Sequence, residues 1–435
     1  ARAAATPEAD DADGAVGPFV LGSGAHRTRW EHGLTPAQVE RFSRQVLVPS
    51  FGPERQAKLL SSRALVVGVG GLGSPAALYL AAAGVGVLGL ADADTVALNN
   101  LHRQVIHEEA AVGHPKVLSA QRACRALNSD LRVRVHPDGV TPCNALALVS
   151  QYDVVVDATD NAPSRYLLND ACVCAGVPLV FGAAIGFEGQ CTVYNFGADC
   201  PCYRCLFPEP PPATACQRCS DAGVVGVVPG IIGVVQAMEA LKVLSGFGQA
   251  LANRMLLLDA RAGRFQTIQL RRRSPDCPVC APSHMKNRLD EQADVYQREA
   301  LNDAAPCLKA LPDGDRLKAS EYAGILERDE AHVLLDVREP TQFHLAALPH
   351  AVNVPWARLE QYSKVQILDA LGMNDAPAGD TQRQPVYVVC RRGNDSQRAV
   401  LMLRDTLRGE GIEVIKDMIG GLQEWSRVSL TFPYY

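Results

Sequence analysis

The stretch Ala64-Leu-Val-Val-Gly68-Val-Gly70-Gly71-Leu-Gly73 decides the fold of this chain. Its apolar half predicts a buried strand, and the alanine-rich run Ser74–Ala83 predicts a helix directly after the glycines. Glycines at such a strand-to-helix turn let phosphate groups approach backbone N–H groups. A second predicted strand, Val85–Ala91, is followed by Asp92, an acid placed to bind ribose hydroxyls. The stretch therefore predicts a nucleotide-binding α/β fold.

The same alternation of strands and helices continues along the chain. A predicted helix over Val117–Leu127 is followed by predicted strands over Arg132–Val135 and Val154–Asp157, the rhythm of a parallel sheet with crossover helices. Upstream, Thr35 followed by a proline predicts a capped helix start. The apolar segment Val224–Leu244 is long enough to span a membrane, but the charged and polar residues within it favour a buried helix.

Changes in composition divide the 435 residues, which are too many for one core, into four parts. They are an acidic tail at residues 1–34, predicted to be disordered, a first α/β unit at 35–284, a polar linker at 285–315 and a smaller α/β unit at 316–435. The smaller unit has predicted strands at Val333–Asp336, Val352–Val354 and Val386–Val389.

Charge and composition exclude some classes of function. The 42 basic and 47 acidic residues give a net charge of −5, so no affinity for nucleic acid follows from charge. No signal peptide is recognisable, and the 14 cysteines are therefore expected in a reducing compartment, where they bind metals or act in catalysis. We expect a cytosolic protein with no direct nucleic-acid partner and no membrane partner.

Polar residues gather at the predicted strand ends in a pattern that does not suit a nicotinamide ring. They are Asp94, Asn100, Arg103, Gln104, Lys116, Asp157, Asp160 and Asn161. Arg103 and Lys116 are suited to bind a triphosphate, and Asp160 to hold Mg²⁺ between its phosphates. The glycine motif by itself favours NAD, so an NAD-dependent oxidoreductase with an appended regulatory module stays open as an alternative.

Seven segments within about residues 35–284 together resemble the MoeB/ThiF adenylating domain, which is related to ubiquitin-activating enzymes. These segments are Arg41–Gln45, Gly68–Gly73, Asp92–Asp94, Asn100–Gln104, Gly113–Lys116, Ala158–Asn161 and Gly186–Gln190. The resemblance implies a Rossmann-like domain with a largely parallel sheet. It also implies an activity: ATP adenylates the C-terminal glycine of a ubiquitin-like sulfur-carrier protein that ends in Gly-Gly.

The resemblance also implies a role for each matching residue. Asp92 is expected to bind the ribose and Asp160 the Mg²⁺ ion. The residues expected to contact the phosphates, or to lie beside them, are Gly70, Gly71, Asn100, Arg103, Gln104, Lys116 and Asn161. Arg44 resembles an arginine that enters the ATP site of the partner subunit, which implies a homodimer.

Three CxxC pairs are present, and a four-cysteine zinc site needs two of them. They are Cys202 with Cys205, Cys216 with Cys219, and Cys277 with Cys280. Spacing alone would join the first two pairs into one compact zinc site. The family resemblance instead joins the first pair to the third and implies one structural zinc ion per subunit.

The resemblance assigns Cys219 to a loop near the activated carboxyl group, which this thiol can attack. Cys216 departs from the family pattern; it either resolves a disulfide with Cys219 or is simply tolerated, and Cys307 in the linker is another candidate partner for Cys219. The cysteines expected in the core are Cys124, Cys143, Cys172, Cys174 and Cys191.

A further cysteine, Cys390, follows the predicted strand Val386–Val389 and begins a polar loop before a helix. The loop residues are Arg391, Arg392, Gly393, Asn394 and Asp395. Backbone N–H groups, the helix N-terminus and two arginines favour an anionic thiolate or persulfide, so we expect them to lower the pKa of the thiol.

This loop, together with Leu334–Glu339 and Leu348–Pro355, resembles a rhodanese domain over residues 316–435. A loop of six residues from Cys390 to Asp395 is typical of a persulfide carrier of the single-domain type. Asp336 and Arg338 are expected to organise the fold or the edge of the site rather than to perform chemistry.

The order of the domains and the ending Phe432–Tyr435 resemble eukaryotic fusions of MoeB/ThiF and rhodanese domains, with bacterial MoeB–rhodanese fusions as the neighbouring alternative. The resemblance implies that Cys390, loaded by a cysteine desulfurase, donates sulfur to the adenylated carrier and gives a thiocarboxylate. Cys219 would form a thioester first or reduce an acyl-disulfide. The implied pathways are thiolation of the tRNA wobble uridine and molybdopterin synthesis. A non-catalytic scaffold that only docks a partner is the remaining alternative.

Overall fold

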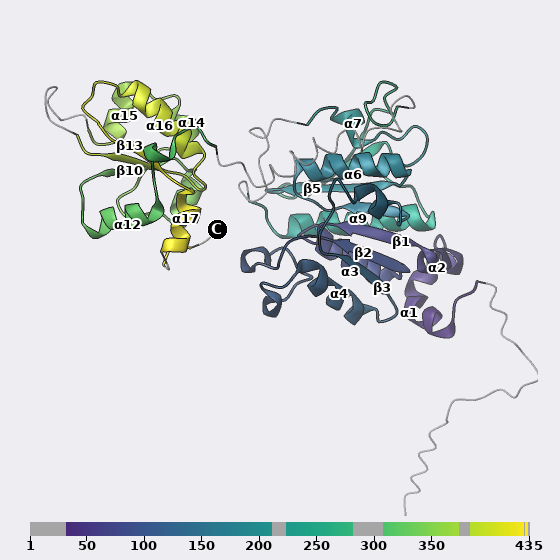
Figure 1. The fold of residues 1–435 in the computed structure, drawn as a ribbon. Helices are drawn as coiled ribbons and strands as arrows, with labels where there is room; N and C mark the ends of the chain where they lie inside the picture. The colour runs from purple at the N-terminus through teal and green to yellow at the C-terminus, as the bar shows by residue number, and fades with distance from the viewer. Residues whose placement is uncertain (1–31, 211–222, 282–307, 374–382, 430, 434–435) are drawn as a thin grey trace, which may run out of the picture.

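The glycine-rich turn joins a strand to a helix in the computed structural model, which describes residues 32–210, 223–281, 308–373, 383–429 and 431–433 (Figure 1). These residues contain two separate sheets, one in each predicted α/β unit. The predicted tail up to residue 31, most of the predicted linker, and Cys216, Cys219 and Cys307 lie outside the described residues.

The first sheet has eight strands in the order β3-β2-β1-β4-β5-β6-β7-β8. Their bounds are β1 Arg63–Val67, β2 Val87–Ala91, β3 Arg132–His136, β4 Val154–Asp157, β5 Leu179–Ile185, β6 Glu188–Tyr194, β7 Arg254–Asp259 and β8 Arg264–Gln269. Strands β1 to β5 pair in parallel, whereas β5 to β8 form an antiparallel meander. The predicted parallel α/β fold is confirmed, and the antiparallel half was not predicted.

Helices cover both faces of this sheet, because successive residues of its central strands point to opposite faces. Val66 packs with α2, α3, α4 and α9 on one face, and Leu65 packs with α5, α6 and α7 on the other (Figure 1). The helices are α1 Pro36–Val46, α2 Gly52–Ser61, α3 Gly73–Ala83, α4 Lys116–Leu127, α5 Ala145–Val149, α6 Ala162–Ala175, α7 Tyr203–Leu206 and α9 Val227–Ser245, with short 3₁₀ turns at Leu98–Asn100 and Glu109–Ala111.

Two helix predictions are confirmed. Thr35 caps α1, because its hydroxyl accepts the N–H of Gln38 and its own N–H donates to the Gln38 side chain. Among the described residues, α9 is the one helix long and apolar enough to cross a membrane, with mean hydropathy 1.7. It is a core helix here: Gln236 on its buried face donates to the carbonyl oxygen of Asp157 at 2.7 Å.

The second sheet has five parallel strands in the order β11-β10-β12-β13-β9. They are β9 Arg316–Leu317, β10 Val333–Asp336, β11 Val352–Asn353, β12 Val386–Val389 and β13 Ile415–Met418. Helices α14 Trp356–Leu359, α15 Lys364–Ala370 and α16 Asp395–Thr406 lie on one face, and α12 Ala319–Glu327 and α17 Gly421–Val428 on the other, with α13 Pro340–Leu345 and a 3₁₀ turn at Asp313–Asp315 (Figure 1). The three predicted strands are confirmed as β10, β11 and β12, whereas β9 and β13 were missed.

Candidate functional site

A cavity of about 270 Å³ opens at the carboxyl ends of β1 to β4. The strand order reverses between β1 and β4, and ligands of parallel α/β sheets bind at such a switch point. Most of the residues predicted to contact ATP line this first cavity. They are Gly70, Gly71, Asp92, Arg103, Gln104, Lys116, Asp160 and Asn161.

The turn between β1 and α3 is too tight for any residue but glycine at two positions. A Cβ atom on Gly73 would lie 1.9 Å from the carbonyl oxygen of Gly68. A Cβ atom on Gly68, which has φ +86°, would lie 2.7 Å from the carbonyl oxygen of Ala158. These close approaches hold the turn against Ala158, and Gly68 and Ala158 both line the first cavity.

His107, which the sequence analysis missed, holds the same turn from the protein side. Its Nε2 lies 3.0 Å from the carbonyl oxygen of Val69, and its Nδ1 lies 3.0 Å from Ser119 Oγ. Burial lowers the pKa of His107, which favours the neutral ring. Since a carbonyl only accepts, Nε2 carries the proton and Nδ1 accepts from the serine hydroxyl. No motif marks this histidine in the sequence.

A buried lysine faces two acids in the first cavity. Lys116 Nζ lies 2.7 Å from Asp94 Oδ2 and 3.9 Å from Asp92 Oδ2, and the lysine side chain is only 6% exposed. Asp92 accepts the backbone N–H groups of Val69 and Asp94 at 2.7 and 2.9 Å. Burial raises the pKa of Asp92, and the charge of Lys116 opposes this shift. The arrangement keeps a fixed cation close to the glycine turn.

Asn100 and Arg44 are the two predicted residues that do not line the first cavity. Asn100 acts on it indirectly, because its Oδ1 accepts from Arg103 Nη2 at 2.6 Å and so orients the guanidinium group. Arg44 is exposed on α1. Gln104 is buried, and its Oε1 has no hydrogen-bond partner among the described residues, which leaves an acceptor in the cavity wall.

Only one of the two carboxylates at the end of β4 is exposed to a ligand. Asp157 is fully buried and accepts from the backbone N–H and the hydroxyl of Thr159 at 3.0 and 2.7 Å. Asp160 is exposed and lines both the first cavity and a second cavity of about 440 Å³. The second cavity runs along β5 to β8 past Glu188 and Arg264. Asp160 therefore stands where the two cavities meet.

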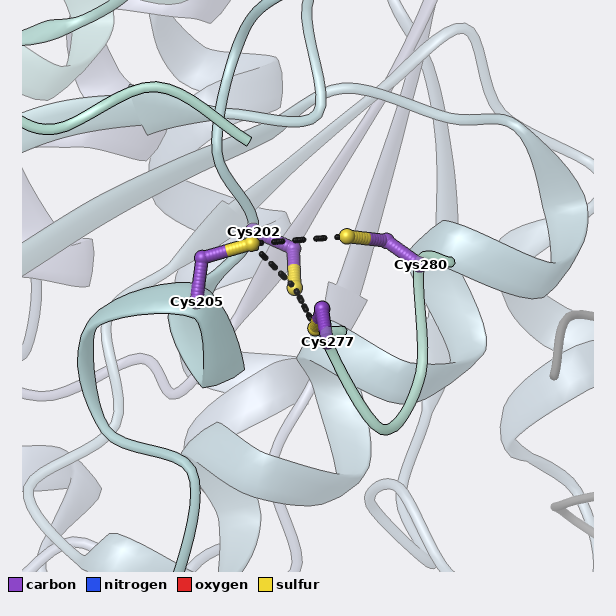
Figure 2. Close-up of side chains that lie close together, drawn as sticks. All are labelled: Cys202, Cys205, Cys277 and Cys280. Atoms are coloured by element: carbon purple, nitrogen blue, oxygen red, sulfur yellow. Dashed lines mark hydrogen bonds between the residues drawn. The ribbon is translucent and has the colours of Figure 1, made fainter. Parts of the chain in front are cut away.

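The four cysteines of the first and third CxxC pairs form one buried cluster (Figure 2). Their Sγ atoms lie 3.5 Å apart for Cys202 and Cys277, 3.4 Å for Cys205 and Cys280, and 3.8 Å for Cys202 and Cys205. A zinc ion with Zn–S bonds of about 2.3 Å needs sulfur atoms about 3.8 Å apart. The cluster therefore fits a tetrahedral metal ion, and the pairing that spacing alone suggested is wrong.

A buried ion pair anchors the turn that carries Cys202 and Cys205 to α6. Arg204, between the first two cysteines, lies 2.9 Å from each carboxylate oxygen of Asp170, and its guanidinium group packs on the Tyr166 ring at 4.6 Å. The N–H of Tyr203 donates to Asn169 Oδ1 at 2.7 Å. The sequence alone does not reveal these contacts, because the partners are 34 positions apart.

Cys390 lies at the end of β12 and is almost completely buried. Its Sγ accepts the N–H of Gly393 at 3.1 Å and contacts Ser396 Oγ at 3.4 Å. Burial raises the pKa of this thiol, and the charge of Asp395 adds to the effect, while the hydrogen bonds of Ser396 and the loop backbone oppose it. The prediction of a lowered thiol pKa is therefore wrong, because desolvation outweighs the hydrogen bonds of the loop.

One of the remaining loop residues ties the loop to the end of the predicted linker. Asn394 Oδ1 accepts the N–H of Leu308 at 2.9 Å, while Arg391 and Arg392 are half-buried. Asp336 and Arg338 form a buried ion pair whose guanidinium group also donates to the carbonyl oxygen of Ala346 at 2.7 Å. These contacts hold the chain beside β10, in line with the structural role expected of this pair.

The other cysteines divide by burial. Cys124, Cys172 and Cys191 are buried in the core, as predicted. The prediction is wrong for Cys143, which is exposed in the turn before α5, and Cys174 is half-buried.

Comparisons with known proteins cover both units. Residues 42–279 match the ThiF family, and residues 318–428 match the rhodanese-like domain. A protein of Arabidopsis thaliana named adenylyltransferase and sulfurtransferase MOCS3 is 50% identical over 409 residues, which cover 93% of this chain and 87% of that protein. A Bos taurus protein of the same name is 43% identical over 406 residues, which cover 92% and 89%. A crystal structure of E. coli MccB with MccA-N7isoASN has a TM-score of 0.51 at 21% identity, covering 58% of this chain and 76% of that one, and so shares the fold alone.

Proposed function

Since the chain belongs to the family of adenylyltransferases and sulfurtransferases that join a ThiF domain to a rhodanese-like domain, we propose that it activates a ubiquitin-like sulfur-carrier protein. In the first step, the C-terminal glycine carboxylate of the carrier attacks the α-phosphate of ATP, and pyrophosphate leaves. In the second step, sulfur replaces AMP at the acyl carbon. The final product is a C-terminal thiocarboxylate.

In the first step, ATP lies in the first cavity. Asp92 binds the ribose, and the backbone N–H groups of Gly70 and Gly71 point at the phosphates. Lys116 and Arg103 supply positive charge where the triphosphate charge accumulates. Supporting this assignment, Lys116 is already fixed in the cavity wall by the exposed Asp94, whose Oδ2 lies 2.7 Å from the lysine Nζ.

Asp160 would hold Mg²⁺, which neutralises phosphate charge when it is bound. Its carboxylate fits this ion, because it is exposed and lines the first cavity, whereas Asn161 Oδ1 accepts the N–H of Ser164 at 2.8 Å and so caps α6. Asp160 also faces the second cavity, which offers the carrier's C-terminal segment a path to the α-phosphate. A Gly-Gly ending suits such a path, because it has no side chains.

In the second step, we assign the sulfur to Cys390. Its persulfide attacks the acyl carbon, the bond to AMP breaks, and an acyl-disulfide forms. A second thiol must then reduce that disulfide, and Cys219 is the proposed thiol: it bonds to Cys390 Sγ, the bond from Cys390 Sγ to the transferred sulfur breaks, and the thiocarboxylate leaves. In the alternative, Cys219 first forms a thioester with the carrier. AMP is a better leaving group than an oxide ion, so the adenylate makes the attack by sulfur feasible.

The four-cysteine cluster would hold one zinc ion per subunit in a structural role, because four thiolates leave no open position for a substrate. Finer parts of the proposal rest on the family resemblance. They are a cytosolic homodimer in which Arg44 reaches the partner's ATP site, loading of Cys390 by a cysteine desulfurase, and service to tRNA thiolation, molybdopterin synthesis or both. The plant and animal relatives favour the eukaryotic type over the bacterial fusion.

One observation carries the proposal: Lys116, Arg103 and Asp160 line a single cavity at the switch point of the sheet. The two cations suit the negative charge of a triphosphate and the carboxylate suits its Mg²⁺ ion, whereas a nicotinamide ring needs neither, which argues against the NAD alternative. Binding calorimetry with ATP and with NAD separates the two nucleotides.

Two variants test the two steps separately. Cys390→Ala should leave ATP–pyrophosphate exchange at the wild-type rate and abolish the thiocarboxylate, whereas Asp160→Ala should abolish both. The exposed Cys143→Ala is the matched control and should change neither. Thiocarboxylate formation at the normal rate by Cys390→Ala would remove Cys390 from the proposal. A full chain unable to transfer sulfur from thiosulfate to cyanide would favour the scaffold alternative.

A further inference from the structure

A buried chain of polar groups lies directly behind the Cys390 thiol. Ser396, on the first turn of α16, places Oγ 3.4 Å from Cys390 Sγ and 3.1 Å from Asp417 Oδ2. Asp417, on β13, is fully buried and accepts from Arg316 Nε and Nη2 at 2.8 and 2.9 Å. Arg316, on β9, also donates to the carbonyl oxygen of Gly393 at 3.3 Å. The chain of contacts therefore starts at the sulfur and returns to the loop around it.

Hydrogen-bond chemistry fixes the direction of these contacts. The carboxylate of Asp417 can only accept, so the Ser396 hydroxyl donates its single hydrogen to it. The same serine oxygen then accepts the S–H of Cys390. This direction suits a neutral thiol and no other state, because a thiolate or persulfide anion can only accept.

An anionic sulfur must therefore compete with Asp417 for the one hydroxyl hydrogen. We infer that the Ser396 hydroxyl is a switch with two positions, which Asp417 and Arg316 control. When Cys390 is a neutral thiol, the hydroxyl donates to Asp417; when Cys390 is a thiolate or persulfide anion, the hydroxyl donates to the sulfur. Asp417 can release the hydroxyl without becoming unpaired, because both Arg316 hydrogen bonds remain. Asp417 and Arg316 are thus positioning residues for sulfur transfer. Their catalytic relevance rests on the proposed role of Cys390 as sulfur carrier.

Other charges near the sulfur do not replace this switch. Asp395 is the closest acid on α16 and opposes an anion at Cys390. Arg391 and Arg392 belong to the loop itself, and the backbone N–H groups of Arg392 and Gly393 favour an anion at the sulfur through hydrogen bonds. Among these groups, Ser396 is the hydroxyl placed between the thiol and a buried ion pair.

The switch predicts opposite shifts for two neighbouring variants. Ser396→Ala removes the donor to the anion and should raise the midpoint of Cys390 alkylation by about one pH unit, a roughly tenfold slower reaction at fixed pH. Ser396→Thr keeps the hydroxyl and should restore the midpoint. Asp417→Asn weakens the competing acceptor and should lower the midpoint by a similar amount. A general loosening of the loop would move both midpoints in the same direction.

The double variant decides whether Asp417 acts through the serine. If it does, Asp417→Asn should shift the midpoint much less in the Ser396→Ala background than in the wild type. Additive shifts, or single variants that shift the same way, would overturn the inference. Ser426→Ala and the exposed Asp405→Asn are the matched controls and should leave the midpoint unchanged.

The measurement uses the full chain. Iodoacetamide labelling at a series of pH values, with mass spectrometry of the peptide that contains Cys390, separates this thiol from the other cysteines. Thermal unfolding of each variant excludes loss of the fold as the cause. A second readout, the gain of one sulfur atom by that peptide after incubation with a persulfide donor, tests the role of Cys390. A shifted midpoint without loading would keep the switch and reject the proposed sulfur carrier.

Discussion

Two alanine substitutions in the glycine turn should separate folding from nucleotide binding. In Gly73→Ala the new methyl group would start 1.9 Å from the carbonyl oxygen of Gly68, and an ordinary contact begins near 3.4 Å, so α3 and β1 must part by about 1.5 Å. Both elements are packed in the core, and overpacking of this kind costs about 1–3 kcal/mol, or more when backbone must move. We expect a clear loss of stability together with a loss of ATP binding.

Gly70→Ala should behave differently. The nearest heavy atom to its new methyl group is Gln104 Nε2 at 3.5 Å, an ordinary contact, and Gly70 does not have positive φ. The fold should therefore be unaffected. The methyl group enters the first cavity, however, where it would displace a phosphate from a backbone N–H group. A hydrogen bond to a charged group contributes about 1.5–3 kcal/mol, so ATP should bind about 10- to 100-fold more weakly.

Thermal unfolding and ATP calorimetry on the same samples provide the test. Gly230→Ala, on the helix α9, is the control, because its methyl group would meet no atom within 4 Å. It should lower neither the unfolding temperature nor the affinity for ATP. Wild-type stability of Gly73→Ala would refute the packing argument. Wild-type affinity of Gly70→Ala would show that phosphates do not bind against this turn, and the assignment of the first cavity to ATP would fail.

Three further outcomes are expected. Lys116→Met should weaken ATP binding at least tenfold in calorimetry, because the buried cation faces the phosphate site, and Lys116→Arg should recover part of the affinity. Equal ATP affinities of wild type and Lys116→Met would contradict this placement. Purified protein should contain one zinc ion per chain by elemental analysis, and Cys277→Ser should lose both the ion and several degrees of unfolding temperature, unlike Cys143→Ser. Because the pKa of Cys390 is raised, the rate of its alkylation should still increase with pH above the ordinary thiol pKa. The folded chain holds the thiol proton to higher pH than the unfolded chain, so the contribution of this thiol to stability should fall as pH rises further. An alkylation rate that reaches its plateau near neutral pH would contradict the raised pKa on which both expectations depend.

Much of the first domain could be predicted from local patterns. The strands around the glycine turn and the polar residues at their ends have their information in consecutive residues, and parallel strands bring their carboxyl ends to one edge. Asp92, Arg103, Lys116 and Asp160 consequently line one cavity, as the sequence suggested. The antiparallel strands β5 to β8 escaped prediction, because the sequence pattern does not state which strand pairs with which.

The cysteines show the same limit more sharply. The CxxC spacing of Cys202 and Cys205 is enough to mark half of a metal site, yet the nearest pair along the chain is not the one that completes it. The pair that does so lies 75 residues away, and only the folded chain brings it within reach.

What the amino-acid order determined by itself is therefore local: a glycine turn between strand and helix, paired thiols, and a cysteine that opens a polar loop. Only the tertiary structure decided which thiols meet, how Arg316 reaches Asp417 across 101 positions, and that Cys390 sits in a desolvated environment that raises its pKa. The physical reason is that burial and electrostatics sum over all neighbours in space. Most of those neighbours are distant in the chain.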